Sequence, residues 1–342
     1  MRQQAPVANF DEIRNILTNL PAPDAAAAGR ARAREATLAK PDGGLGRLEE
    51  LTAWMAGWQG QHPPAADRAR VCVFAGSHGV AAHGVSAYPA DATARMVGAF
   101  VAGGGAVNQV CQSINAELRI YEMALDTPTA DIADGPAMSE TDCARAMAYG
   151  MMAVEPGLQL ICLGDIGIGN TTAAAALCLA LFGGSAADWT GPGSGVSGAA
   201  LDRKRRIVEA AVAANPAAAD DPLDALRRLG GPELSAVAGA VIAARMARIP
   251  VLLDGFASTA AAAVLARARP DALDHCLAAH RGEAPGHGRL LERLAMTPLT
   301  DFGITMGEGV GAALAVPLLR AALACHSGMT TAAEAGIERS PS

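Results

Sequence analysis

Five short runs of apolar or β-branched residues are spaced along the chain, and each ends in a cluster of glycine and polar residues. The runs lie at 71–75, 118–124, 158–163, 251–253 and 276–279. Alanine-rich stretches of helical length separate them, at 92–110, 173–181, 204–214, 233–247 and 259–268. Continuous apolar runs are typical of strands buried on both faces. Their alternation with helices predicts an α/β fold, a Rossmann-like three-layer parallel sheet with helices on both faces.

The two ends of the chain lack such runs. Residues 1–60 are helical and polar in pattern, and residues 301–342 contain one long apolar helix that Pro317 is expected to kink or interrupt. We therefore expect 1–60 and 301–342 to form a small helical domain. Residues 61–300 would form the large α/β domain that carries the active site, with 215–222 as a loop between two helices.

In open parallel sheets, ligands bind beyond the carboxyl ends of the strands, where the five polar clusters converge. The most informative cluster follows the run at 158–163. It contains Gly164, Gly167 and Gly169, and polar residues 170–172 then open an alanine-rich helix. A glycine-rich turn before a helix N-terminus presents backbone N–H groups and the positive end of the helix dipole, which together favour an anion.

This turn matches the spacing of a P-loop only in part. Gly164, four residues, Gly169 and then Thr171 fit, but Asn170 stands where a P-loop needs the lysine that reaches the outer phosphates. A nucleoside triphosphatase is therefore disfavoured. A site for one phosphate or a phosphoribosyl group remains open, and so does an ordinary strand-to-helix turn.

Three side chains are candidates for chemistry. Glu308 lies between glycines in MGEGVG; burial there would raise its pKa and make it a competent general base, although a first-turn helix acid or N-cap fits equally well. Asp165 could hold a ribose hydroxyl or cap the following helix. Lys204, nine residues after the GPGSG turn, could contact a phosphate or lie in solvent.

Composition narrows the class of protein. Of 342 residues, 51% are apolar and 18% charged, which is typical of a compact enzyme, and the net charge of −7 shows no basic stripe for nucleic acid. We expect no membrane partner, because the N-terminus lacks the apolar core of a signal peptide and no apolar run reaches spanning length. Seven cysteines without a CxxC pair indicate a reduced, cytoplasmic protein.

Other chemistries are poorly supported. His78 and His83 have no carboxylate at a metal spacing, so we expect no zinc or other metal. His280 and His287 fit hydrogen-bonded loop residues or substrate contacts. There is no GxSxG elbow of a serine hydrolase. Transferases that use the diphosphate donor carry adjacent acids after a strand, where this chain has only Asp254.

Eight segments, taken in order, resemble one family. They are KPDGGLGRLE from Lys40, SHGV with GVSAYP, GPAMS, GDIGIGNTT, Lys204 after GPGSG, RLGG, PVLLDGF and GEGVGAALA. Each is weak alone, but together they span the chain from Lys40 to about Ile337. The chain resembles the nicotinate-nucleotide:dimethylbenzimidazole phosphoribosyltransferase family of cobalamin assembly.

The resemblance implies transfer of a phosphoribosyl group from nicotinate mononucleotide to a benzimidazole nitrogen, by a two-fold dimer and without a metal or cofactor. It implies Glu308 as the general base. The implied phosphoribosyl site comprises Asp165, Gly167, Gly169, Asn170, Thr171, Gly193, Gly195 and Lys204. The implied base pocket comprises Ser77, His78, Tyr88, Met96, Met306 and Gly307.

The sequence departs from the family pattern where substrate choice is decided. Ser77 replaces an aspartate, Gly44 a serine and Thr305 an arginine, while Asp165 and Tyr88 also stand at variable positions. The physiological acceptor could thus be dimethylbenzimidazole, adenine, another benzimidazole or a phenol. The alternative of a different class is a non-catalytic nucleotide-binding or sensor protein, against which the retained Glu308 argues.

Overall fold

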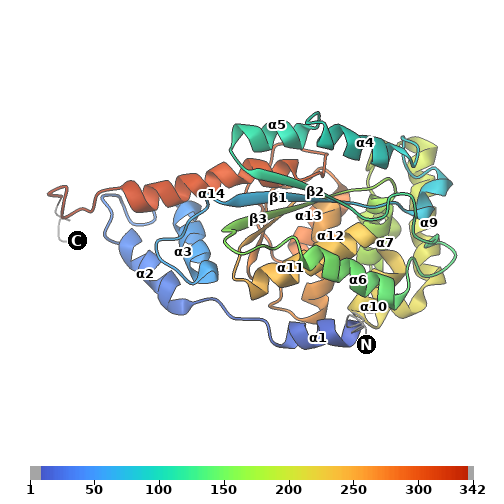
Figure 1. Cartoon of the computed structure of the whole chain (residues 1–342), viewed down its shortest axis with the longest axis horizontal. Helices are drawn as coiled ribbons and strands as arrows, with labels where there is room; N and C mark the ends of the chain where they lie inside the picture. Colours follow the sequence, from blue (N-terminus) through green and yellow to red (C-terminus); the bar gives the residue numbers. More distant parts are fainter. Residues whose placement is uncertain (1–8, 338–342) are drawn as a thin grey trace, which may run out of the picture.

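The computed structural model describes residues 9–337, and its centre is a five-stranded sheet in which every neighbouring pair is parallel (Figure 1). The strand order is β2-β1-β3-β4-β5. The strands are β1 Ala69–Ala75, β2 Glu117–Glu122, β3 Leu160–Ile166, β4 Val251–Leu253 and β5 Cys276–Ala278. The predicted parallel α/β sheet is confirmed, with strand ends within three residues of the apolar runs.

Both faces of the sheet are covered, and successive side chains of a strand point alternately into two hydrophobic cores. On β1, Val71 and Val73 face one core, whereas Cys72 and Phe74 face the other. A strand whose two faces are both covered must be apolar throughout, which explains why the pattern contains runs rather than alternation. The edge strand β2 is only half-buried, and its sequence ELRIYE is accordingly mixed.

Helices cover both faces and make three layers. One face carries α4 Ala92–Val101, α5 Ala106–Ser113 and the first part of α14 Val310–Gly328 (Figure 1). The other core is built from the helices α6 Glu140–Met151, α7 Asn170–Phe182, α8 Ala186–Trp189, α9 Gly198–Ala214, α10 Pro222–Leu229, α11 Pro232–Met246, α12 Gly255–Ala268 and α13 Pro285–Arg293.

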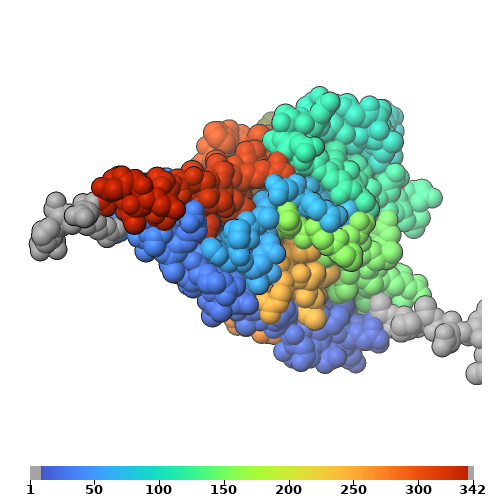
Figure 2. Space-filling model, turned by 60° about the vertical axis from the view of Figure 1, so that its left-hand side comes forward, coloured from blue at the N-terminus to red at the C-terminus, as the bar shows by residue number. Residues whose placement is uncertain are grey.

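The end of α14 projects from this body together with α2 Ala25–Glu35 and α3 Arg47–Gln59 (Figures 1 and 2). Arg34 of α2 donates to the carbonyls of His326 and Ser327, which ties the two helices together. We propose these helices as the core of the small helical domain, 1–60 with 301–342. The helix α1 Phe10–Thr18 lies apart from them, because its apolar face packs beneath the sheet near α6.

Two local expectations are corrected by the structure. The stretch 92–110 is two helices, α4 and α5, because Gly103 at φ +81° and its glycine neighbours end the first helix. Pro317 does not interrupt α14, which is continuous from Val310 to Gly328 with Pro317 on its exposed side and packing on its other side; a kink at Pro317 stays a prediction. The expected loop between two helices at 215–222 is confirmed, since it connects α9 to α10, and residues 216–219 within it form a turn of 3-10 helix.

The helix α14 is also long and apolar enough to cross a membrane by length and composition. Within the described residues it is the only such helix, and 56% of its most apolar 18-residue stretch is buried inside the protein. Its apolarity is therefore accounted for in large part by contacts with β1, β3 and α5.

Candidate active site

The order of the strands creates a switch point between β1 and β3. The chain moves from β1 to β2 on one side of the sheet, and the later strands are added on the other side. The turns after β1 and β3 meet there so closely that a Cβ on Gly167 would lie 2.6 Å from the carbonyl oxygen of Gly76. In doubly wound sheets, ligands bind at such switch points, beyond the carboxyl ends of the strands.

Asp165 is the buried acid of this region. It lies near the end of β3, and its carboxylate accepts hydrogen bonds from the amide of Asn170 at 2.7 Å and from the hydroxyl of Ser258. Burial raises the pKa of Asp165 to about 7, the bond from Ser258 opposes that rise, and the negative charge of Glu233 adds to it. Asp165 therefore titrates near neutrality.

Glu308 is held directly against β3. Its backbone N–H donates to the carbonyl of Asp165 at 3.1 Å, and a Cβ on Gly164 would lie 2.3 Å from the nitrogen of Gly309. Glu308 adopts φ +65°, a conformation uncommon for a residue with a side chain. The two acids of the site thus come from segments far apart in the sequence, and the bare Cα of Gly164 permits their approach.

The carboxyl of Glu308 is itself unpaired. Its Oε2 is buried without a hydrogen-bond partner among the described residues. Burial raises the pKa of Glu308 to about 7, and the neighbouring charge of Asp254 adds to the rise. An unpaired carboxyl that titrates near neutrality has the properties of a general base. Glu308 is not the N-cap of α14, because that position belongs to Gly309.

Lys204 is a buried cation without an acidic partner among the described residues. Its ammonium donates to Thr171 Oγ1 at 2.8 Å, and burial lowers the pKa of Lys204 to about 8. Gly193, at φ +55°, lies beside both groups, since a Cβ there would be 2.7 Å from Lys204 Nζ. Gly195, at φ +107°, borders open space. The structure thus brings the GPGSG turn, α9 and the first turn of α7 together around one ammonium.

The glycine-rich turn itself has the expected form. Gly169 is the N-cap of α7 at φ +100°, and no side chain caps the helix. Its neighbour Asn170 links the turn to Asp165, and Thr171 links it to Lys204. Together, Asn170 and Thr171 connect the acid near the end of β3 with the buried cation through two adjacent residues of one helix.

The residues expected to line the base pocket occupy different environments. Ser77 donates to the carbonyl of Leu125, and His78 is buried with its Nε2 2.6 Å from Glu233 Oε1. Gly307 lies against the backbone of Asp165. Met306 is largely exposed, with 42% of its surface accessible.

Tyr88 and Met96 lie on the segment that follows β1. Tyr88 is 61% exposed, and its loop is tied to the GPGSG turn by a 2.6 Å hydrogen bond between Ser86 and Ser194. Met96 of α4 is half-buried against the core that includes Val73. The loop that carries Tyr88 is therefore anchored beside the phosphate candidates.

Comparison with known proteins identifies the family of this chain. A family model described as phosphoribosyltransferase matches residues 20–337. A nicotinate-nucleotide–dimethylbenzimidazole phosphoribosyltransferase of Rhizobium meliloti is 53% identical over 96% of this chain and 97% of its own length. The enzyme of that name from Brucella anthropi is 52% identical over 97% and 98%. The crystal structure of the enzyme from Thermus thermophilus superposes with a TM-score of 0.84 at 37% identity, covering 93% of this chain and all of that one. The chain belongs to this phosphoribosyltransferase family.

Three buried groups of this phosphoribosyltransferase escaped the sequence analysis as parts of the site. Glu233 begins a stretch predicted to be helical, Ser258 lies in the polar cluster after the run at 251–253 without being singled out, and Asp254 was considered only as a lone acid after a strand. Asp254 is fully buried, and its carboxylate accepts from the backbone N–H groups of Gly309 and Ala312. A buried acid directly after a strand was the available signal, but its partners come from a segment 55 residues away.

The histidines of the phosphoribosyltransferase have carboxylate or loop partners. His83 contacts Asp131, and His287 accepts from the backbone N–H of Gly282 at 2.9 Å. His280 is fully buried with its Nε2 3.4 Å from Asp254 Oδ1. No group of three or more potential metal-ligating side chains is present among residues 9–337.

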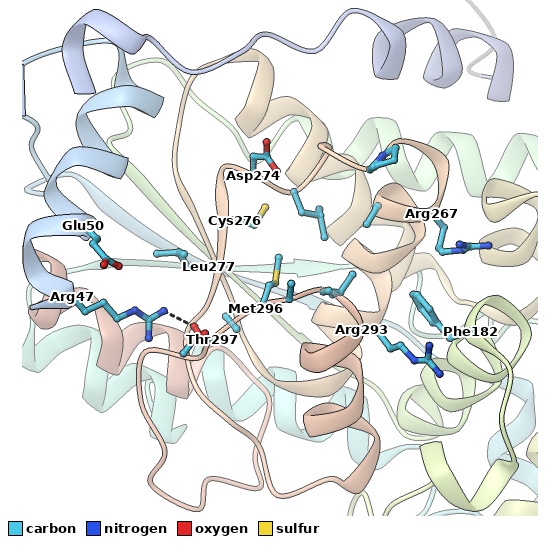
Figure 3. A pocket seen from close by; sticks show the side chains of 16 residues that line it. Arg47, Glu50, Phe182, Arg267, Asp274, Cys276, Leu277, Arg293, Met296 and Thr297 are labelled. Atoms are coloured by element: carbon cyan, nitrogen blue, oxygen red, sulfur yellow. Dashed lines mark hydrogen bonds between the residues drawn. The ribbon is translucent and has the colours of Figure 1, made fainter. Parts of the chain in front are cut away.

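One large cavity lies elsewhere on the phosphoribosyltransferase. It has a volume of about 890 Å³ and follows the outer edge of β5, between α3, α12 and α13 (Figure 3). Its apolar floor includes Leu277 and Met296, and Arg47 at its rim donates to the carbonyls of Thr297 and Pro298. None of the candidate site residues lines it, so we locate the chemistry at the switch point instead, where the titrating acids and the buried lysine lie.

Proposed function

We propose that this enzyme transfers the phosphoribosyl group of nicotinate mononucleotide to dimethylbenzimidazole, giving alpha-ribazole phosphate and nicotinate for the nucleotide loop of cobalamin. The observation that carries the chemistry is the buried, unpaired carboxyl of Glu308 with a pKa of about 7. The names of the relatives support the substrates.

The donor is proposed to be anchored by its phosphate. A buried ammonium without a carboxylate is costly unless an anion joins it, and within residues 9–337 the one hydrogen-bond partner of the Lys204 ammonium is the hydroxyl of Thr171. The N-terminus of α7, capped by no side chain, points its dipole at the same place. Gly167, Gly169, Gly193 and Gly195 would let the backbone approach the phosphate, and Asn170 and Asp165 would face the ribose.

The reaction needs only one proton acceptor. Nicotinate leaves from a pyridinium as a neutral ring nitrogen, so its bond to the anomeric carbon breaks without an acid. A nitrogen of dimethylbenzimidazole forms the new bond to that carbon, and the proton on its other nitrogen passes to Glu308. Inversion places acceptor and leaving group on opposite faces of the ribose.

The acceptor is proposed to lie between Glu308 and the segment after β1. Tyr88, Met96 and Met306 would supply flat or flexible apolar contacts, and Gly307 would leave room for the ring. Ser77 would lie at the pocket margin, and His78 would support its floor, since its imidazole is turned toward Glu233.

We further propose that the enzyme is a cytoplasmic homodimer. Leu314 and Leu318 are exposed large apolar residues four positions apart on α14, and Phe302 is 71% exposed. Residues spaced by four lie on one face of a helix, where a second copy could cover them. Light scattering after gel filtration tests this, because a monomer mass at micromolar concentration would contradict it.

Product analysis tests the activity. The purified enzyme is incubated with nicotinate mononucleotide and equal amounts of dimethylbenzimidazole, adenine and p-cresol, and products are identified by mass, with Glu308→Ala as the control. Dimethylbenzimidazole ribotide as the main product is expected. A preference for adenine or the phenol would correct the acceptor, while donor binding without any product would support the sensor alternative.

A further inference from the structure

The carboxylate of Asp254 caps a helix to which it does not belong. Asp254 follows β4 and precedes α12, yet its Oδ2 accepts from Gly309 N at 2.9 Å and its Oδ1 from Ala312 N at 2.7 Å. Both N–H groups belong to the start of α14, whose own N-cap is a glycine without a side chain to accept them. Asp254 therefore replaces the missing capping side chain.

This cap fixes the residue next to it. Glu308 is bounded on one side by its own hydrogen bond to the carbonyl of Asp165 and on the other by the bond from Gly309 to Asp254. A residue with a side chain at φ +65° needs such restraints, because the conformation is sparsely populated otherwise. The position of the Glu308 carboxyl thus depends on Asp254 through a single peptide unit.

His280 stands opposite the same carboxylate. Its ring is fully buried, its Nε2 is 3.4 Å from Asp254 Oδ1, and neither ring nitrogen has a hydrogen-bond partner among the described residues. The start of α14 encloses it, since a Cβ on Gly311 would lie 2.1 Å from its Cδ2. Burial lowers the pKa of His280, but Asp254, the backbone of Arg281 and the charge of Asp301 together outweigh burial and raise that pKa.

The charges around this pair come from several elements. Five titratable or charged groups besides Glu308 interact electrostatically or by hydrogen bonding with Asp254, His280 or their immediate neighbours. They are Asp165 and Cys162 on β3, Arg281 and His287 after β5, and Asp301 before α14. His280 is the basic side chain that directly faces Asp254, and it is cationic when both ring nitrogens are protonated. The charge that Asp254 presents to Glu308 therefore depends on whether His280 balances it.

We propose that Asp254 and His280 are positioning residues for Glu308: Asp254 holds its peptide in place, and the pair together sets the electric field at its carboxyl. This inference rests on the proposed role of Glu308 as the base. The two members act in opposite directions, because Asp254 contributes a negative charge and His280 a positive one. A merely structural pair would have no such opposed effect.

The experiment is a titration of Glu308 that does not require turnover. The protein is labelled with ¹³C at the glutamate carboxyls, and the signal of Glu308 is assigned by its absence in Glu308→Gln. His280→Gln should move the midpoint of Glu308 to higher pH, and Asp254→Asn should move it to lower pH, each by about half a pH unit or more. Gln and Asn keep the size of the side chains they replace.

Turnover gives the second readout. The pH at which kcat falls on the acid side should move in the same direction as the midpoint in each variant, and kcat of Asp254→Asn should also drop about tenfold or more through misplacement. If Asp254→Asn does not fold, the shift in His280→Gln decides alone.

The outcomes distinguish a failure of the positioning role of Asp254 and His280 from a failure of the proposed function. Midpoints that stay unchanged, or that move in the same direction in both variants, would overturn the positioning role even if the enzyme is active. Opposite shifts of the Glu308 midpoint in a protein that makes no product would instead support the pair and overturn the proposed function.

Discussion

Lys204 donates to Thr171 across 2.8 Å in an environment that is buried and, among the described residues, without a carboxylate for the ammonium. The pair joins α9 to the first turn of α7, which places a cation beside the helix N-terminus after β3. Two positive features at one place repel each other in the absence of ligand and attract the same anion. The free enzyme is therefore destabilised where the donor is to bind.

Replacing Lys204 should stabilise the free protein and weaken its binding of the donor. Lys204→Met removes a charge whose pKa burial lowers to about 8, so the free protein should melt at a higher temperature at pH 7. The KM for nicotinate mononucleotide should rise about tenfold or more, since a charge-assisted bond to phosphate is lost, with a smaller change in kcat. Thermal melts and initial rates measure both.

The matched control is Arg206→Met on the same helix, whose side chain is exposed. It should leave the melting temperature and KM nearly unchanged. An unaltered KM in Lys204→Met would remove this lysine from the phosphate site.

Removing the carboxyl of Glu308 should affect chemistry rather than binding. Glu308→Ala should lower kcat by roughly a hundredfold or more, the scale of a general base, while the affinity for nicotinate mononucleotide stays close to that of the native enzyme. Single-turnover rates and calorimetric titration give the two values. Retention of full turnover would exclude Glu308 from proton transfer.

The sequence predicts the sheet better than it predicts the site. The runs at 71–75 and 251–253 coincide with β1 and β4 to within two residues, because strands buried on both faces leave an apolar signature. The helix break at 103–105 was missed because small residues are compatible with a helix as well as with its end. Glu308 is singled out by the glycines that surround it, and Lys204 by the family motif; the roles of both in the site stay predictions.

Contacts between distant segments were not predictable in this way. Nothing in VLLDGF indicates that Asp254 accepts the N–H groups of a helix that begins at Val310, since a lone acid after a strand normally caps its own helix. No sequence pattern indicates that His78 pairs with Glu233 either. Such relationships depend on which loops meet at the switch point, and that is set by the packing of whole layers.

The pH dependence of stability should reveal the buried carboxyl of Glu308. Its pKa is raised from 4.5 to about 7, so the native protein binds this proton more tightly than the unfolded chain. The resulting stability is present below pH 4.5 and is lost as the pH rises through 7. Glu308→Gln cannot ionise, so its melting temperature should exceed that of the native enzyme at pH 8 by about 2–4 °C, the effect of ~1 kcal/mol in a chain of this size.

At pH 4 the two proteins should melt alike, and the exposed Glu209→Gln should match the native enzyme at both values. A difference between Glu308→Gln and the native enzyme that is independent of pH would show that the carboxyl is not the cause.

Turnover is expected to be independent of divalent metal ions. The departing nicotinate needs no Lewis acid, and Lys204 would neutralise the phosphate of the donor. Activity in EDTA, after dialysis against the chelator, should equal that of the untreated enzyme. Loss of activity that added Mg²⁺ restores would mean that the donor is held in a different way.

Adding one methyl group at Gly164 should displace the segment that carries Glu308 and so lower the activity. The new Cβ would lie 2.3 Å from Gly309 N and 2.9 Å from the carbonyl carbon of Glu308, and backbone atoms cannot rotate away from it. The segment around Glu308 must therefore move, which is expected to cost about 1–3 kcal/mol and to lower the melting temperature.

Displacement of a catalytic group by about 1 Å can reduce turnover by about a hundredfold, so kcat of Gly164→Ala should fall severely even well below its melting temperature. Gly98→Ala is the matched control, because a Cβ there meets nothing within 4 Å in an exposed part of α4. Normal kcat in Gly164→Ala would show that the contact between β3 and the Glu308 segment is not what places the base.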